Sequence, residues 1–89
     1  MPRVVIPPPF RGPTQGKGEI EVEGKTVREC LDALEAEHKG FLDQVVAPDG
    51  TVQRFAKVFV NEEQVADGNL DLPLESEDEI QILAAIAGG

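Results

Sequence analysis

The sequence predicts an α+β fold in which one main helix packs on one face of a mixed β-sheet. Residues 18–24 and 54–61 alternate apolar and polar side chains, as half-buried strands do. Between them, residues 26–39 carry apolar side chains at the spacing of a helix. Shorter strand-like runs, at 3–6 and 80–86, stand near the two ends of the chain. Two strands therefore precede the helix, and the remaining strands follow it.

The helix is predicted from its start signal and from its apolar stripe. Thr26 is a good N-cap, and Glu29, three residues later, completes a capping box worth about 1 kcal/mol. Gly40 is placed to cap the other end, with His38 solvated just before it. The cysteine of the stripe is expected to pack as a small apolar side chain. The stripe consists of Val27, Cys30, Leu31 and Leu34.

The remaining segments read as connections. Residues 7–18 are rich in proline and glycine and predict a stiff loop between the first two strands. Residues 41–46 indicate a short turn of helix, and 61–65 a tight turn leading into a short strand. Three leucines within 67–74 are expected to anchor a loop, and 75–79 form an acidic turn.

The predicted order is strand, strand, helix, strand, short strand, strand. A ubiquitin-like β-grasp satisfies this order most economically, with the first and last strands side by side and parallel at the centre of the sheet. The last strand is then buried, and the glycines that follow it project past the edge of the sheet. We expect a single domain over residues 1–89 with a flexible C-terminal Gly-Gly tail.

Composition excludes several functions. Seventeen acidic residues against eight basic ones give a formal charge of −9, which argues against nucleic-acid binding because that needs cationic groups. No stretch approaches the roughly 20 apolar residues of a membrane span, and the first residues do not form a secretion signal. A single cysteine, Cys30, cannot form an internal disulfide, so a cytoplasmic location is expected.

Independent catalysis is not expected. The chain has one histidine, His38, no Cys/His cluster for a metal, no spread Ser/His/Asp set and no glycine-rich phosphate loop. We therefore expect no catalytic residue, no metal and no stably bound cofactor.

The C-terminal stretch AAIAGG, residues 84–89, carries the main functional hypothesis. A Gly-Gly ending by itself fits a frayed terminus equally well. The alternative is that the carboxylate of Gly89 is the reactive group, activated with ATP in the nucleotide site of another protein. Ala87 and Gly88 would then thread through a narrow channel, for which glycine is suited because it has no Cβ.

The sequence resembles the MoaD/ThiS family of ubiquitin-like sulfur carriers over essentially its whole length, with the last twenty residues most specific. The resemblance implies that a ubiquitin-activating-enzyme-like adenylyltransferase uses ATP to adenylate Gly89. A sulfur donor protein then helps to form a C-terminal thiocarboxylate, which an acceptor biosynthetic enzyme consumes. Ala84 stands where many members have proline. The matching stretches are VVIPPPFRGPTQG, TVRECLDALE, RFAKVFVNEEQV and LDLPLESEDEIQILAAIAGG.

Several functions are compatible with this resemblance, and some alternatives lie outside it. The carrier would be a protein cosubstrate rather than an enzyme, serving cysteine synthesis, molybdopterin synthesis or tRNA thiolation. Length and the 47–61 section look closest to the carriers of cysteine synthesis. Alternatively, the chain is the non-catalytic small subunit of molybdopterin synthase, or a modifier joined to lysines through an isopeptide bond. A binding module without tail chemistry is the residual alternative.

A carrier must also be recognised away from its tail. Alternation places Phe55 and Phe59 on the sheet face opposite the helix, and Leu83 joins them if the last strand packs under the helix. We expect these three residues to form a partner surface. The alternative is that loop 7–17 covers them through Phe10.

Overall fold

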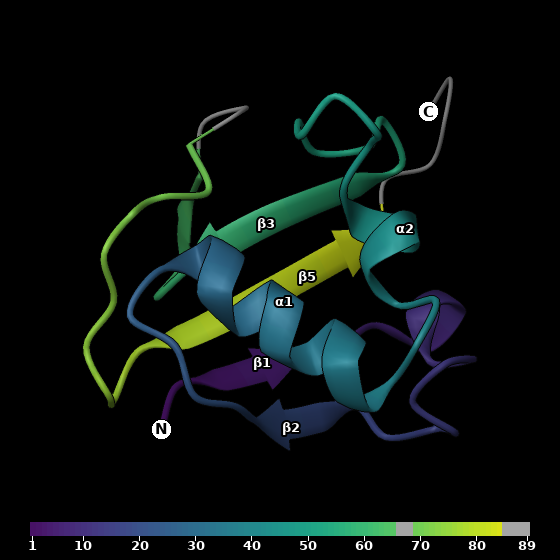
Figure 1. Cartoon of the computed structure of the whole chain (residues 1–89), viewed down its shortest axis with the longest axis horizontal. Helices are drawn as coiled ribbons and strands as arrows, with labels where there is room; N and C mark the ends of the chain where they lie inside the picture. Colours follow the sequence, from purple (N-terminus) through teal and green to yellow (C-terminus); the bar gives the residue numbers. More distant parts are fainter. Residues whose placement is uncertain (66–68, 85–89) are drawn as a thin grey trace.

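The computed structural model describes residues 1–65 and 69–84, and shows a five-stranded mixed sheet with its helices on one face (Figure 1). The order of the strands across the sheet is β2-β1-β5-β3-β4. The elements are β1 (Arg3–Val5), a 3-10 turn (Pro8–Phe10), β2 (Glu19–Glu21), α1 (Val27–Glu37), α2 (Leu42–Val45), β3 (Ala56–Val60), β4 (Glu63–Gln64) and β5 (Glu79–Ala84).

The topology is that of a ubiquitin-like β-grasp, as predicted. The first and last strands run parallel and adjacent, with Val4 opposite Ile80, whereas every other pair of neighbouring strands is antiparallel. β5 lies between β1 and β3 and is the central strand of the sheet. Figure 1 shows its arrow running from the N-terminal end of the molecule toward α2.

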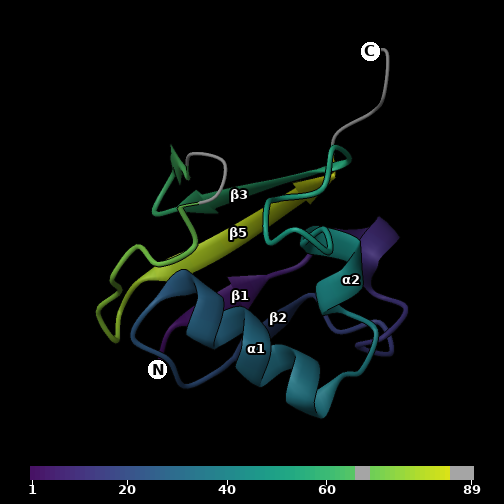
Figure 2. The same cartoon turned by 45° about the horizontal axis from the view of Figure 1, so that its top comes forward.

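The core lies between α1 and one face of the sheet. Val4, Val58, Ile80 and Ile82 are fully or almost fully buried on that face. The whole predicted stripe of α1 is buried against them, which confirms both the helix and its orientation (Figure 2). Burying one such aliphatic side chain contributes about 1.5–3 kcal/mol to the free energy of folding, so this layer stabilises the packing of α1 on the sheet.

The start of α1 matches the prediction with one difference. The Thr26 hydroxyl oxygen accepts a hydrogen bond from the Glu29 N–H at 3.1 Å, as in a capping box. The Glu29 carboxylate, however, accepts from the N–H of Lys25 at 2.9 Å rather than from that of the N-cap residue. The Glu29 carboxylate therefore closes the box one residue before the N-cap, and the helix still begins after Thr26.

The backbone N–H groups in the first turn of α1 donate hydrogen bonds to the segment that precedes β5. The Val27 and Arg28 N–H groups, which have no partner inside the helix, donate to the carbonyls of Leu72 and Leu70 at 3.2 and 2.7 Å. The Leu70 side chain is buried, and those of Leu72 and Leu74 pack on the core, as predicted for the leucine anchors. The helix therefore positions the segment that leads into the central strand.

The turn between β3 and β4 fixes the beginning of β5. Asn61 and Glu62 have positive φ angles of 49° and 75°, as in the tight hairpin turn that the sequence predicted. The Asn61 amide donates to the Asp78 carboxylate at 2.8 Å, and its oxygen accepts from the Glu79 N–H at 3.0 Å. The second Asp78 oxygen accepts from the N–H of Glu75 at 2.8 Å.

Some boundaries differ from the sequence prediction. β3 begins at Ala56 rather than at residue 54, because the Ala56 N–H donates to the Gln53 carbonyl and closes a turn over 54–55. β2 covers only residues 19–21 of the predicted 18–24. Residues 85–86 of the predicted last strand, and 67–68 of the leucine loop, lie outside the described residues. The short helix at 41–46 is confirmed as α2.

We expect Gly24→Ala to destabilise the protein. A Cβ on Gly24 would lie 2.7 Å from the Cys30 nitrogen and 2.8 Å from its sulfur, so α1 or the end of β2 must move. Overpacking of this kind costs about 1–3 kcal/mol. Urea unfolding followed by far-UV circular dichroism measures it, since the chain has neither tryptophan nor tyrosine.

Gly12→Ala is the matched control for this substitution. A Cβ at Gly12 would meet no atom within 4 Å, so its unfolding free energy should change by no more than about 0.5 kcal/mol. Equal unfolding midpoints for the two variants would contradict the close packing of Gly24 against α1.

The hydrogen bonds to Asp78 predict a pH dependence of stability. Donation by the Glu75 N–H, and then by the Asn61 amide, holds the pKa of the Asp78 carboxyl below its ordinary value of 3.8. A lowered folded-state pKa stabilises the protein above that ordinary value, and the effect is lost as the pH falls through the lowered one. The stability difference between wild type and Asp78→Asn should therefore shrink from about pH 7 to about pH 2.

Asp32→Asn is the control because it changes the net charge equally, and the Asp32 side chain forms no hydrogen bond or ion pair in the described ranges. Urea midpoints across the pH series should show a pH-dependent difference for Asp78→Asn alone. A constant difference would mean that the Asp78 carboxylate does not contribute through its charge.

Candidate functional site

The proposed reactive tail lies beyond the last described residue, Ala84. Ala87, Gly88 and Gly89 lie outside the described residues, so their predicted roles stay predictions. Ala84, the last described residue, belongs to β5 and lies opposite Ala56 of β3. At this end β5 pairs with β3 alone, since its pairing with β1 ends at Gln81, so β3 positions the last described residues of the strand.

We call the sheet face opposite α1 the open face. It consists of the strand residues whose side chains point away from the core. Register places three rows of side chains on it, because residues directly opposite one another share a face. The row at the start of β5 contains Glu21, Arg3 and Glu79; the middle row contains Glu19, Val5, Gln81, Phe59 and Gln64; and the last row contains Leu83 and Lys57. None of the elements that cover the core lies over this face.

Two of the predicted partner residues are brought together by register. Leu83 lies directly opposite Lys57, and Phe59 is two residues further along β3, which makes Phe59 a diagonal neighbour of Leu83. Leu83 is 36% exposed, and Phe59 is half-buried. The predicted patch therefore exists, near the end of the sheet from which the tail departs.

Phe55 lies near the same end of the sheet, but strand register does not place its side chain. The sequence put it inside β3, whereas it lies in the turn before the strand, so alternation does not determine its face. Its side chain is 51% exposed, the largest exposed fraction of any phenylalanine in the described part of the chain. We call Phe59 and Leu83 the open-face patch, and Phe55 stays a predicted member of the partner surface.

The alternative that loop 7–17 covers the patch is wrong. The Phe10 ring packs against the core, and its carbonyl accepts a hydrogen bond from the Gln44 amide of α2 at 3.0 Å. The loop is held there by further bonds: the Arg11 guanidinium donates to the Ile6 carbonyl at 2.9 Å, and the buried Thr14 hydroxyl donates to the Lys17 carbonyl at 2.8 Å. The open-face patch consequently stays exposed.

Cys30 is unsuited to sulfur chemistry. Its side chain is fully buried in the stripe of α1, as predicted, and lies against Gly24. Burial, with a smaller contribution from the charge of Glu29, raises the pKa of the Cys30 thiol above its ordinary value. A thiol that is neither accessible nor ionised is a poor nucleophile, so Cys30 cannot relay sulfur or form a thioester without unfolding.

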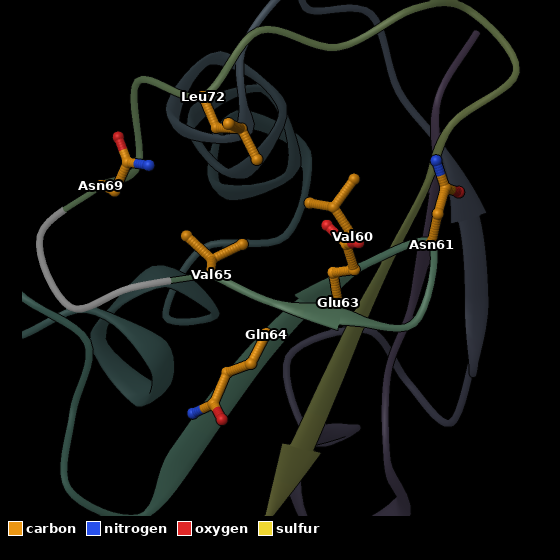
Figure 3. A pocket seen from close by; sticks show the side chains of 7 residues that line it. All are labelled: Val60, Asn61, Glu63, Gln64, Val65, Asn69 and Leu72. Atoms are coloured by element: carbon orange, nitrogen blue, oxygen red, sulfur yellow. The ribbon is translucent and has the colours of Figure 1, made fainter.

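A hollow of about 530 Å³ lies between β4 and the segment before β5 (Figure 3). The side chains of Val60, Val65 and Leu72 point into it, whereas Gln64 points away toward the open face. Glu63 is the one titratable residue among its lining side chains, which include no nucleophile. An acid without a second titratable group or nucleophile beside it does not make a catalytic site.

Within residues 1–65 and 69–84, no three His, Cys, Asp or Glu side chains gather closely enough to hold a metal ion. No helix in these ranges is long and apolar enough to cross a bilayer. His38 lies at the C-cap of α1, half-buried rather than fully solvated as predicted. The cytoplasmic location stays a prediction from the cysteine content.

Comparisons with known proteins agree with this geometry. The sequence pattern of the ThiS family matches residues 11–89. A protein of Archaeoglobus fulgidus, named as a candidate sulfur carrier, is 34% identical over 77 residues, which is 84% of this chain and 86% of the relative.

Two solved structures overlay the whole domain. A chain from the BexX/CysO complex of Amycolatopsis orientalis has a TM-score of 0.88 at 34% identity, and the match covers 100% of both chains. CysO of Mycobacterium tuberculosis also has a TM-score of 0.88, at 29% identity, covering 97% of this chain and 100% of CysO.

The fold, the strand that leads into the tail and the exposed patch beside it define a ubiquitin-like carrier of the β-grasp class. The chain belongs to the ThiS family, whose members include the sulfur carriers that the sequence resembles.

We expect the Cys30 thiol to be protected from alkylation in the folded protein. If reaction requires global unfolding, iodoacetamide should modify the native protein at least about a thousandfold more slowly than the protein in concentrated urea. Intact mass measured over time gives both rates. Native labelling within tenfold of the unfolded rate would show that Cys30 is accessible through a local opening.

Proposed function

We propose that this protein carries sulfur on the carboxylate of Gly89. A carboxylate oxygen of Gly89 attacks the α-phosphorus of ATP, and pyrophosphate leaves. A sulfide-level sulfur then attacks the carbonyl carbon of the acyl-adenylate, the carbon–oxygen bond to AMP breaks, and AMP leaves with the bonding electrons. The product is a thiocarboxylate, whose sulfur is delivered to an acceptor enzyme. Both steps take place in other proteins, and this chain is their cosubstrate.

The observation that carries the proposal is the central position of β5. A tail that must reach a distant nucleotide site has to leave its domain at a defined point, and β5 pairs with β1 as far as Gln81 and with β3 as far as Ala84. The family match extends along β5 and through residue 89. The described residues offer no competing centre, since Cys30 is buried and the lining of the hollow beside β4 has a single acid.

Cysteine synthesis is the acceptor pathway we propose first. The length of the chain and its 47–61 section resemble the carriers of that pathway, and the two chains from CysO structures match this chain over nearly all of its length. We further propose that the partners are an adenylyltransferase of the ubiquitin-activating class, a sulfur donor protein and the acceptor enzyme.

Intact-mass spectrometry of the protein from its native cell tests the proposal. A fraction should be heavier by the difference between one sulfur and one oxygen atom, and fragmentation should place that difference on Gly89. A modified fraction mapped to any other residue would contradict the proposal. Conjugates of higher mass joined to lysines would favour the modifier instead, and a co-purifying heteromer would favour the synthase subunit.

A variant with one alanine added after Gly89 provides the matched test in vitro. It should support no ATP–pyrophosphate exchange with the activating enzyme. Its terminal carboxylate is displaced from the reacting position, and its terminal residue, alanine, has a Cβ that glycine lacks. The control is Gly12→Ala, whose Cβ would meet no atom within 4 Å, and it should react as the wild type does. Full exchange by the extended protein, with the addition still attached, would contradict the role of Gly89.

A further inference from the structure

β4 (Glu63–Gln64) is an edge strand of the sheet. The Val65 N–H donates to the Val58 carbonyl at 2.8 Å, which makes Val58 and Val65 a hydrogen-bonded pair. Such pairs alternate with non-hydrogen-bonded ones along an antiparallel ladder, so the neighbouring pair, Phe59 and Gln64, is non-hydrogen-bonded. The N–H and C=O of Gln64 therefore point away from β3, and no strand in the described part of the chain lies on that side.

The hollow of about 530 Å³ lies beside this free edge (Figure 3). Val60, Val65 and Leu72 form its apolar wall. Glu63 lies directly opposite Val60, so both side chains are on the sheet face toward α1, and Glu63 also lines the hollow. An extended segment that pairs with an edge strand directs alternate side chains to the same face. One side chain of a segment paired with β4 therefore enters the hollow.

Glu63 selects the charge of that side chain. It is the one titratable residue in the lining, and it forms no ion pair within residues 1–65 and 69–84. An apolar wall next to a carboxylate suits a side chain with an aliphatic stem and a cationic head. Arginine has both, and its planar guanidinium is more weakly hydrated than an ammonium and pairs with carboxylates through two hydrogen bonds, which favours arginine over lysine.

A second copy of this chain fits the edge less well than a basic segment does. Pairing of β4 with β4 would bring Glu62 and Glu63 of both copies into one contact, and like charges on neighbouring strands destabilise their pairing. A basic segment of another protein is instead attracted by these carboxylates. The net charge of −9 favours the same encounter at longer range.

We propose that β4 and the hollow beside it bind an extended, arginine-bearing segment of a partner protein. The segment pairs with the N–H and C=O of Gln64. Its arginine stem packs on the apolar wall of the hollow, and the guanidinium contacts the Glu63 carboxylate. Strand addition of this kind takes its affinity from backbone hydrogen bonds and its specificity from the pocket that receives a side chain.

This site is separate from the exit of the tail. Val60, in the wall of the hollow, lies opposite Ile80 near the start of β5, whereas Ala56 lies opposite Ala84 at its end. A segment bound to β4 thus occupies the end of the sheet away from the last described residue. The inference goes beyond the proposed function and does not depend on chemistry at Gly89, so either can fail without the other.

Titration with a capped pentapeptide, Thr-Val-Arg-Val-Thr, followed in amide NMR spectra of the full chain, tests the site. The signals of Gln64, Val65 and Leu72 should shift together, whereas that of Ala84 should not. A matched peptide with norleucine in place of arginine has the stem without the charge, and should bind about threefold more weakly. This difference should shrink as salt is added.

Two substitutions separate the parts of the site. Glu63→Gln removes the charge, and should weaken binding of the arginine peptide about threefold while leaving the norleucine peptide nearly unchanged. Gln64→Pro removes the outward N–H, which an edge strand tolerates, and should weaken both peptides about fivefold. The control is Glu37→Gln, which makes the same charge change at the other end of α1 from Val27, whose N–H donates to Leu72. It should change binding by less than about 1.5-fold.

Hydrogen exchange gives a readout that needs no variant. In the free protein the Gln64 N–H should exchange at least about tenfold faster than that of Val65, which is bonded to β3, and the arginine peptide should slow it. Urea unfolding of each variant shows whether weaker binding reflects a less stable fold.

Several results would overturn the proposal. These are slow exchange of the Gln64 N–H in the free protein, peptide-induced shifts confined to another surface or absent, and equal binding of the arginine and norleucine peptides. Dimers in sedimentation that Gln64→Pro abolishes would assign the edge to a second copy of this chain, and would overturn it as well.

Discussion

The burial of β5 between β1 and β3, under α1, is the constraint on which the rest of the structure depends. Ile80 and Ile82 point into the core, so their neighbours on the strand must point to the open face. A shift of the strand by one residue would exchange the two sets and expose both isoleucines to water. The core thus fixes the register of β5, and with it the composition of the open face.

The elements around β5 hold its two ends by different means. At its start, Asn61 and Asp78 tie the β3–β4 turn to the strand, and the free N–H groups of α1 hold the segment before it. At its other end, register with β3 places Leu83 opposite Lys57. β5 is therefore held at its start by side-chain and backbone hydrogen bonds, and at Ala84 by its pairing with β3 alone.

Buried and exposed side chains are divided between the two faces of the sheet. The buried thiol of Cys30 stabilises the core as an apolar side chain, and its raised pKa keeps it unreactive. Apolar and charged groups available for contact with a partner occupy the sheet face that no helix covers. The packed core and the exposed open-face patch therefore occupy opposite faces of one sheet.

The elements and their order could be predicted from the sequence, because strands and helices space their apolar side chains with periods of 2 and 3.6 residues. The sequence also identified the capped start of α1, the buried Cys30 and the open-face patch. Only the tertiary structure decided that Lys57 faces Leu83, that Arg3 joins three strands, and that Asn61 and Asp78 fix the start of β5. These relations link residues far apart in the chain, and register between strands is set by packing in the core, which no local pattern records.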